Sequence, residues 1–131
     1  MVNKMIALDD IAKDNYDIQK ITYDENGLII YLNGNNFILN IDFGSVSSYC
    51  LFDEGCRIKF YNSIEEIQVY RMNKFYGIPI FKNDKSKFSN WLSSESYGFS
   101  DNLEYYTIIT ANNIIEIACP FSPKIINEKV K

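Results

Sequence analysis

The 131-residue sequence contains no histidine. This absence excludes Ser-His-Asp and Cys-His nucleophilic centres and every metal site that needs an imidazole ligand. The three cysteines have no Cys-x-x-Cys spacing, and without histidine they do not complete the usual tetrahedral zinc site. We therefore expect no metal and no cofactor, and we predict that the protein is not an enzyme.

Long apolar runs and glycine-rich loops are also missing. No run approaches the ~20 apolar residues of a membrane-spanning helix, and the first residues lack the apolar core of a signal peptide. The six glycines stand singly, so they form no phosphate-binding loop. The odd number of cysteines is typical of a reducing compartment. These absences predict a cytoplasmic protein without a membrane segment.

What the chain does contain is apolar and aromatic side chains, at 47% and 15% of the residues, which predicts a single domain over 1–131 with its own core. The net charge is −4, with −6 over residues 1–56, +4 over 57–87 and −2 over 88–131. An acidic total argues against nonspecific binding to duplex nucleic acid.

Short apolar segments between turn residues predict an antiparallel meander with strands at 17–23, 28–32 and 37–43. We expect 46–52 to continue this sheet, 57–61 to be extended, and 77–81 to form an edge strand or a turn because of Pro79. A hairpin is expected from 105–110 and 114–119. Pro120 and Pro123 should end it, leaving a frayed tail over 127–131.

Three segments have helical patterns. A short amphipathic helix is expected within 3–16, and a Ser63/Glu66 capping box predicts a helix over 64–72. A third helix, capped by Asp84 or Ser86, would place Phe88, Trp91 and Leu92 on one apolar stripe and stop at Gly98. The predicted fold class is α+β, an antiparallel sheet with one or two helices packed on one face.

Catalytic candidates are few. Glu116 lies between Ile115 and Ile117 in an apolar strand, where it either marks the solvent face or is a partly buried carboxylate with a perturbed pKa. An unusual hydrolase without histidine would need such a buried carboxylate. Cys56 precedes Arg57, which could lower the pKa of the thiol, but no histidine base is present to support a nucleophile.

Binding is better supported than catalysis. Twenty aromatic residues exceed the need of a small core, so some should lie on the surface and serve as interface anchors. The acidic first half would favour a basic partner. The aromatic and basic segment 57–87 leaves an alternative, a binding site for a small ligand or single-stranded nucleic acid.

Several motifs also carry a resemblance. They are Phe43-Gly44-Ser45-Val46-Ser47-Ser48-Tyr49, Asp53-Glu54-Gly55, Phe88 with Trp91-Leu92, Ser96-Tyr97-Gly98, and the segment from Tyr105 to Ile117. Over 17–126 the chain resembles small uncharacterised bacterial proteins, some of which are similar to immunity partners of polymorphic toxins. The resemblance implies a protein that binds and blocks a cognate toxin in the cytoplasm, and it assigns no functional residue.

We accordingly predict a cytoplasmic protein-binding module, immunity-like, whose partner is a protein such as a cognate toxin. The predicted partner-binding residues are acidic and aromatic: Asp53, Glu54, Tyr61, Tyr97 and Tyr105.

Overall fold

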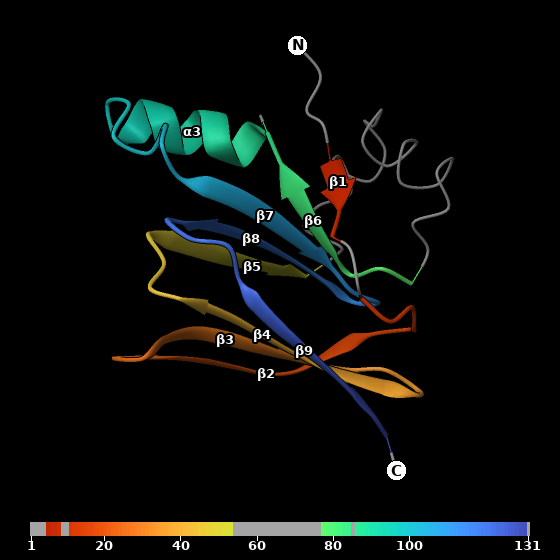
Figure 1. Cartoon of the computed structure of the whole chain (residues 1–131). Helices are drawn as coiled ribbons and strands as arrows, with labels where there is room; N and C mark the ends of the chain where they lie inside the picture. Colours follow the sequence, from red (N-terminus) through yellow and green to blue (C-terminus); the bar gives the residue numbers. More distant parts are fainter. Residues whose placement is uncertain (1–4, 9–10, 54–76, 85, 131) are drawn as a thin grey trace.

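Two antiparallel sheets pack face to face in the computed structural model, which describes residues 5–8, 11–53, 77–84 and 86–130 (Figure 1). The five-stranded sheet has the order β1-β6-β7-β8-β5. Its strands are β1 (Met5–Ala7), β5 (Ser48–Asp53), β6 (Ile80–Asn83), β7 (Glu104–Ile109) and β8 (Asn113–Cys119). The four-stranded sheet has the order β2-β3-β4-β9, with β2 (Asp17–Asp24), β3 (Gly27–Asn33), β4 (Phe37–Gly44) and β9 (Lys124–Lys129).

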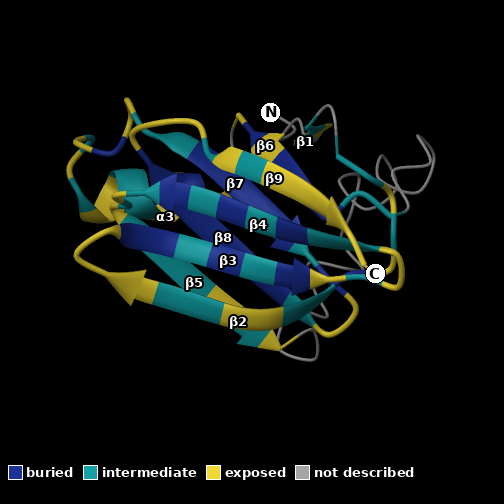
Figure 2. Cartoon of the chain, turned by 60° about the horizontal axis from the view of Figure 1, so that its bottom comes forward, coloured by how far each residue is buried: buried dark blue, intermediate teal, exposed yellow. Residues whose placement is uncertain are grey.

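The main core lies between the two sheets. Alternate residues of the central strands point inward, as the two-residue period of a strand requires, and they exclude solvent almost completely (Figure 2). The inward side chains are Leu28, Ile30, Leu32, Leu39, Ile41, Phe43, Tyr106, Ile108, Ile115, Ile117 and Cys119. Phe43 and Tyr106 meet edge to face across the sheets, with ring centroids 5.7 Å apart. This interlayer packing joins the two sheets.

One helix, α3 (Lys87–Glu95), lies against the outer face of the five-stranded sheet in the described residues. It begins at Ser86, whose hydroxyl accepts the Ser89 N–H while the Ser89 hydroxyl accepts the Ser86 N–H. Phe88 packs on Tyr105 of β7 and Ala118 of β8, which forms a smaller second core. The α+β fold class with antiparallel sheet is therefore confirmed, and so are the helix cap at Ser86 and the hairpin of β7 with β8.

The meander is confirmed as β2, β3 and β4, but the expectation that 46–52 extends the same sheet is wrong. Gly44 has a φ of +64° and turns the chain, and Ser47 then donates its N–H to the Ala118 carbonyl. As a result β5 pairs with β8 in the other sheet. Local alternation predicts a strand equally well in either layer, so it could not choose between them.

The two chain ends also differ from expectation. Met5, Ile6 and Ala7 form β1 on β6, and residues 11–16 are not helical, so the predicted helix within 3–16 is wrong. The expected frayed tail is wrong over 127–129, because β9 pairs with β4 from Asp42↔Lys124 to Phe37↔Lys129. Pro120 and Pro123 interrupt only the connection between sheets.

The middle of the chain is described in part. Pro79 precedes β6, which lies between β1 and β7 and is not an edge strand. Proline has no backbone N–H to donate, but the Pro79 carbonyl still accepts the Ile109 N–H, so Pro79 keeps one backbone hydrogen bond to the chain next to it. The expected strand at 57–61 and helix at 64–72 lie outside the described residues.

Candidate functional site

Four chain connections gather at one end of the sandwich, at the left of Figure 1: the turn 24–27, the connection 44–48, the turn 96–103 and the connection 120–123. We call this the aromatic end. These connections carry Tyr97, Phe99 and Phe121, which are 95%, 89% and 72% exposed, and the aromatic end also includes Tyr23, the residue of β2 just before the turn 24–27, which is 58% exposed. Trp91 lies in α3, the helix that leads into the turn 96–103, and is 55% exposed. Aromatic rings of this kind supply much of the binding energy in protein interfaces.

The turn 96–103 follows directly from the way α3 ends. Ser96 is the C-cap, and the next residue, Tyr97, has a φ of +52°. The Gly98 N–H reaches the Ser93 carbonyl at 2.8 Å and the Tyr97 N–H reaches the Ser94 carbonyl at 3.4 Å, which is the hydrogen-bond pattern of a Schellman motif. Tyrosine occupies the left-handed position that glycine usually takes in this motif. Local geometry thus fixes where the Tyr97 side chain leaves the helix.

Side-chain hydrogen bonds hold the rest of this turn. The Ser93 hydroxyl donates to the Asp101 carboxylate at 2.6 Å, and the Ser100 N–H donates to the Ser96 hydroxyl at 3.1 Å. The buried Tyr105 hydroxyl donates to the Ser100 carbonyl at 3.0 Å and ties the turn to β7. The exposed rings of Tyr97 and Phe99 are therefore carried by a backbone that is fixed on both sides.

A second network fixes the connection that carries Phe121. The Glu104 carboxylate accepts the Tyr106 hydroxyl at 2.7 Å and the Ser122 hydroxyl at 2.9 Å, and it pairs with the Lys82 ammonium at 3.1 Å. Partial burial works to raise the pKa of Glu104, but these donors outweigh it and lower that pKa. Burial raises the pKa of the Tyr106 hydroxyl, which therefore stays a hydrogen-bond donor.

Cys119 lies beside this network and is buried. Burial is the main cause that raises the pKa of its thiol to about 11, and the thiol donates to the Phe121 carbonyl at 3.2 Å. A thiol with a raised pKa is a poor nucleophile at neutral pH. Cys119 thus serves as a packing residue of the core.

The predicted partner-binding residues do not gather at one place. Tyr97 is at the aromatic end and fully accessible. Tyr105 is wrong as a surface residue: it is 6% exposed, because its side of β7 faces α3 and packs on Phe88. Asp53 is exposed but lies at the far end of β5, opposite Asn113. Glu54 and Tyr61 lie outside the described residues.

Glu116 is buried, at 4% exposure, so the solvent-face alternative is wrong. It lies on the outer face of the five-stranded sheet, between Thr107 of β7 and Cys50 of β5. Thr107 is also buried and accepts a hydrogen bond from the Asn83 side-chain amide. These residues form a buried polar row, and their alternation with inward apolar residues explains why Glu116 interrupts an apolar segment.

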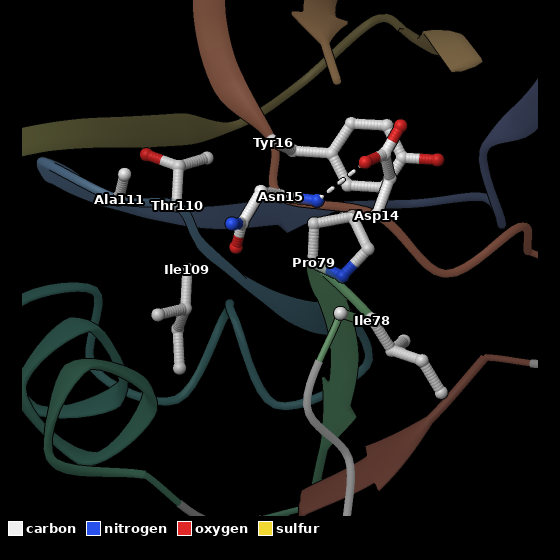
Figure 3. A pocket seen from close by; sticks show the side chains of 9 residues that line it. Asp14, Asn15, Tyr16, Ile78, Pro79, Ile109, Thr110 and Ala111 are labelled. Carbon is white, nitrogen blue, oxygen red and sulfur yellow. Dashed lines mark hydrogen bonds between the residues drawn. The ribbon is translucent and has the colours of Figure 1, made fainter. Parts of the chain in front are cut away.

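A shallow pocket of about 140 Å³ lies at the opposite end, lined by Asp14, Asn15, Tyr16, Gly77, Ile78, Pro79, Ile109, Thr110 and Ala111 (Figure 3). The Asn36 N–H, which the Asp14 carboxylate accepts, is the main cause that lowers the pKa of Asp14. Burial raises the pKa of Tyr16 to about 12. The pocket is smaller than the roughly 300 Å³ at which small-molecule sites begin.

Phe99, Phe121 and Tyr23 are the residues of the aromatic end that sequence reasoning missed. Two of them had a usable pattern: Phe99 stands in the polar segment Ser96–Asn102 and Phe121 stands between two prolines. An aromatic residue in a polar turn has no strand or helix face to bury it. Such positions are therefore candidates for surface anchors.

Comparison with known proteins found no matching family model, no similar curated protein and no similar solved structure. Among the described residues, no cluster of three or more Cys, Asp or Glu side chains is arranged to hold a metal ion. In the same part of the chain, α3 is too short and too polar to span a bilayer.

Proposed function

We propose that this chain is a non-enzymatic module that binds a protein partner through its aromatic end. The observation that carries the proposal is the exposure of Tyr97 and Phe99 on a turn held by hydrogen bonds at both ends. Aromatic side chains have few rotatable bonds, and on a backbone that is already held in place they lose less conformational entropy on binding, so more of their burial energy appears as affinity.

The proposed partner class is a toxin that the module blocks in the cytoplasm, as the resemblance to immunity proteins implies. Inhibition by an immunity protein needs a binding surface and no chemistry of its own. An exposed aromatic surface beside acidic side chains supports such a role. The histidine-free composition supports it as well, because Ser-His-Asp and Cys-His nucleophilic mechanisms need that residue.

The alternative site in 57–87 has less support in its described part. Phe81 is fully buried, so its ring is not accessible for stacking on a base. Lys82 is engaged with Glu104, and the pocket at the opposite end holds little more than a few water molecules. Nucleic-acid stacking needs accessible rings beside accessible cations. The aromatic end therefore remains the better-supported site.

Co-expression tests the proposal. The product of the adjacent upstream gene would be expressed in a host cell alone and together with this chain, and growth and co-purification would be measured. We expect the chain to restore growth and to co-purify with that product. Failure of the upstream product both to impair growth and to bind would contradict the toxin assignment.

A variant pair tests the surface itself. The double substitution Tyr97→Ala/Phe99→Ala should weaken binding at least 100-fold, because it removes two central anchors. The matched control, Leu51→Ala/Ile126→Ala, removes two exposed apolar side chains from β5 and β9, away from the aromatic end. The control should bind as the wild type does. Equal binding by both double variants would exclude the aromatic end as the interface.

A further inference from the structure

The connections of the aromatic end contain acidic side chains as well as exposed apolar ones. These four connections, 24–27, 44–48, 96–103 and 120–123, contain the carboxylates Asp24, Glu25 and Asp101 and no lysine or arginine. All three carboxylates belong to exposed residues. The apolar anchors and the acidic side chains therefore occupy the same end of the molecule.

The end of α3 adds to this negative potential. The last turn of the helix contains Glu95 and no basic residue, although a cation there would be favourable. The carbonyl groups at a helix C-terminus carry partial negative charge. Tyr97 and Phe99 follow immediately, so the two most exposed rings stand next to a helix end that has no basic side chain in its last turn.

The neighbouring cations do not neutralise this region fully. Lys82 is paired with Glu104, whose network holds the 120–123 connection. Lys124, at the start of β9, is an exposed basic residue that borders the same connection. Against it stand Asp24, Glu25 and Asp101 and the C-terminus of α3. Among the residues that the structure describes, the balance of charge at the aromatic end is negative.

The geometry points to a cationic partner surface: a protein segment that places arginine side chains on the rings of Tyr97 and Phe99, with their charge facing the exposed carboxylates Glu95 and Asp101 at the end of α3. This inference rests on the proposed function and names the chemistry of its partner. A guanidinium stacks on an aromatic face and still donates to a carboxylate, which a neutral or anionic segment does not do. Complementary charge also accelerates encounter and disfavours acidic competitors.

A peptide titration tests the chemistry without knowledge of the partner. The full chain would be titrated with Ac-(Gly-Arg)₄-NH₂, Ac-(Gly-Lys)₄-NH₂ and Ac-(Gly-Glu)₄-NH₂. Binding would be followed by backbone amide NMR shifts and by the fluorescence of Trp91, which is the single tryptophan of the chain. We expect weak binding in the order Arg, Lys, Glu, with the largest shifts in 95–103. Binding should weaken several-fold between 50 and 300 mM salt.

A matched pair of variants separates local recognition from general attraction to an acidic protein. Glu95→Gln/Asp101→Asn should lower the affinity for the arginine peptide at least fivefold. Asp53→Asn/Glu128→Gln makes the same change in net charge at exposed positions away from the aromatic end and should leave the affinity within twofold. Equal effects of the two pairs, or shifts spread over all exposed strands, would overturn the inference.

The same variants distinguish this inference from the proposed function. Once the protein partner is in hand, loss of binding by Tyr97→Ala/Phe99→Ala together with full binding by Glu95→Gln/Asp101→Asn would keep the interface and refute the cationic partner. Full binding by both variants would refute the interface and the cationic partner together. Loss of binding by both, with salt-dependent association, is the result we expect.

Discussion

Both ends of the sandwich consist of short connections between antiparallel strands, but only one of them exposes large apolar side chains. We call the end formed by segment 11–16 and the turns 33–36 and 110–113 the anchored end. There the Asp14 carboxylate accepts N–H groups of Asn36, Phe37 and Asn15, at 2.6, 2.9 and 2.8 Å. The Ala111 N–H donates to the Tyr16 carbonyl at 3.1 Å and joins the two sheets.

The aromatic end satisfies its polar groups equally well, yet it turns its largest apolar side chains outward. No residue of 11–16, 33–36 or 110–113 is an exposed large hydrophobic one, whereas the aromatic end has four. Poor packing does not explain this difference, because the turn 96–103 and the connection 120–123 are held by internal hydrogen bonds. Exposed rings on an end held by internal hydrogen bonds support the proposed role in binding.

The largest effect on stability is expected where the aromatic end is most crowded. Gly27 has a φ of +101°, and a Cβ there would lie 2.1 Å from the Gly44 carbonyl oxygen. Gly27→Ala should therefore lower the free energy of unfolding by about 3 kcal/mol, from backbone strain together with overpacking. Urea denaturation measures the loss.

Gly44→Ala is the matched control for that substitution. Gly44 also has a positive φ, +64°, but a Cβ there meets nothing within 4 Å. This variant should lose only about 1 kcal/mol, from backbone strain alone. Equal losses of stability in the two variants would show that the close approach of Gly27 to the Gly44 backbone does not exclude a side chain at position 27.

The Glu104 network should have the next largest effect. Tyr106→Phe removes the hydroxyl that donates to Glu104 while keeping the ring packed on Phe43. We expect a loss of about 1–2 kcal/mol in the free energy of unfolding, because a partly buried carboxylate loses a donor. Tyr23→Phe, which removes a hydroxyl from an exposed tyrosine, should change stability by less than about 0.5 kcal/mol. Similar losses in both would contradict a structural role for the network.

The contribution of the anchored end to stability should depend on pH. The pKa of Asp14 is lower in the folded protein than its ordinary value of 3.8, so its charge contributes stability above that value. This contribution is lost as the pH falls through the folded-state pKa. Urea midpoints measured between pH 6 and pH 2 should therefore fall more for the wild type than for Asp14→Asn. Parallel curves for the two proteins would contradict the anchoring role of Asp14.

The parts of this fold that could be predicted from the sequence are local. The residues Asp24–Gly27 give the β2–β3 turn, and the alternation from Phe37 to Phe43 gives β4 with its inward face. Sheet membership could not be predicted, because pairing β5 with β8 joins residues about 65 positions apart in the chain. β9 was missed because Lys124–Lys129 is mostly polar and packs mainly Ile125 against the core.

The candidate site could be predicted only in part for the same reason. Tyr97 was predicted as an exposed aromatic residue from the aromatic content of the chain, and its place in a polar turn was not used. Tyr105 was misplaced because a strand with α3 on its outer face buries both sides, and the sequence does not show which face a helix covers. The gathering of Tyr23, Phe99 and Phe121 at one end depends on the order of strands in two sheets, which short motifs do not encode.

The smallest effect on stability, and the sharpest test of the comparison between the two ends, is expected at Tyr97. Glycine relieves the left-handed backbone, so Tyr97→Gly should raise the free energy of unfolding by about 0.5–1 kcal/mol. It should also weaken partner binding at least tenfold, because the exposed ring is lost. Tyr97→Ala keeps the backbone strain, so it should weaken binding without the gain in stability. If Tyr97→Gly gained stability and bound the partner as well as the wild type does, the tyrosine would only strain the backbone and would have no role in binding. The opposite changes in stability and affinity that we expect are those of a residue kept for its contact with a partner, at a cost to the fold.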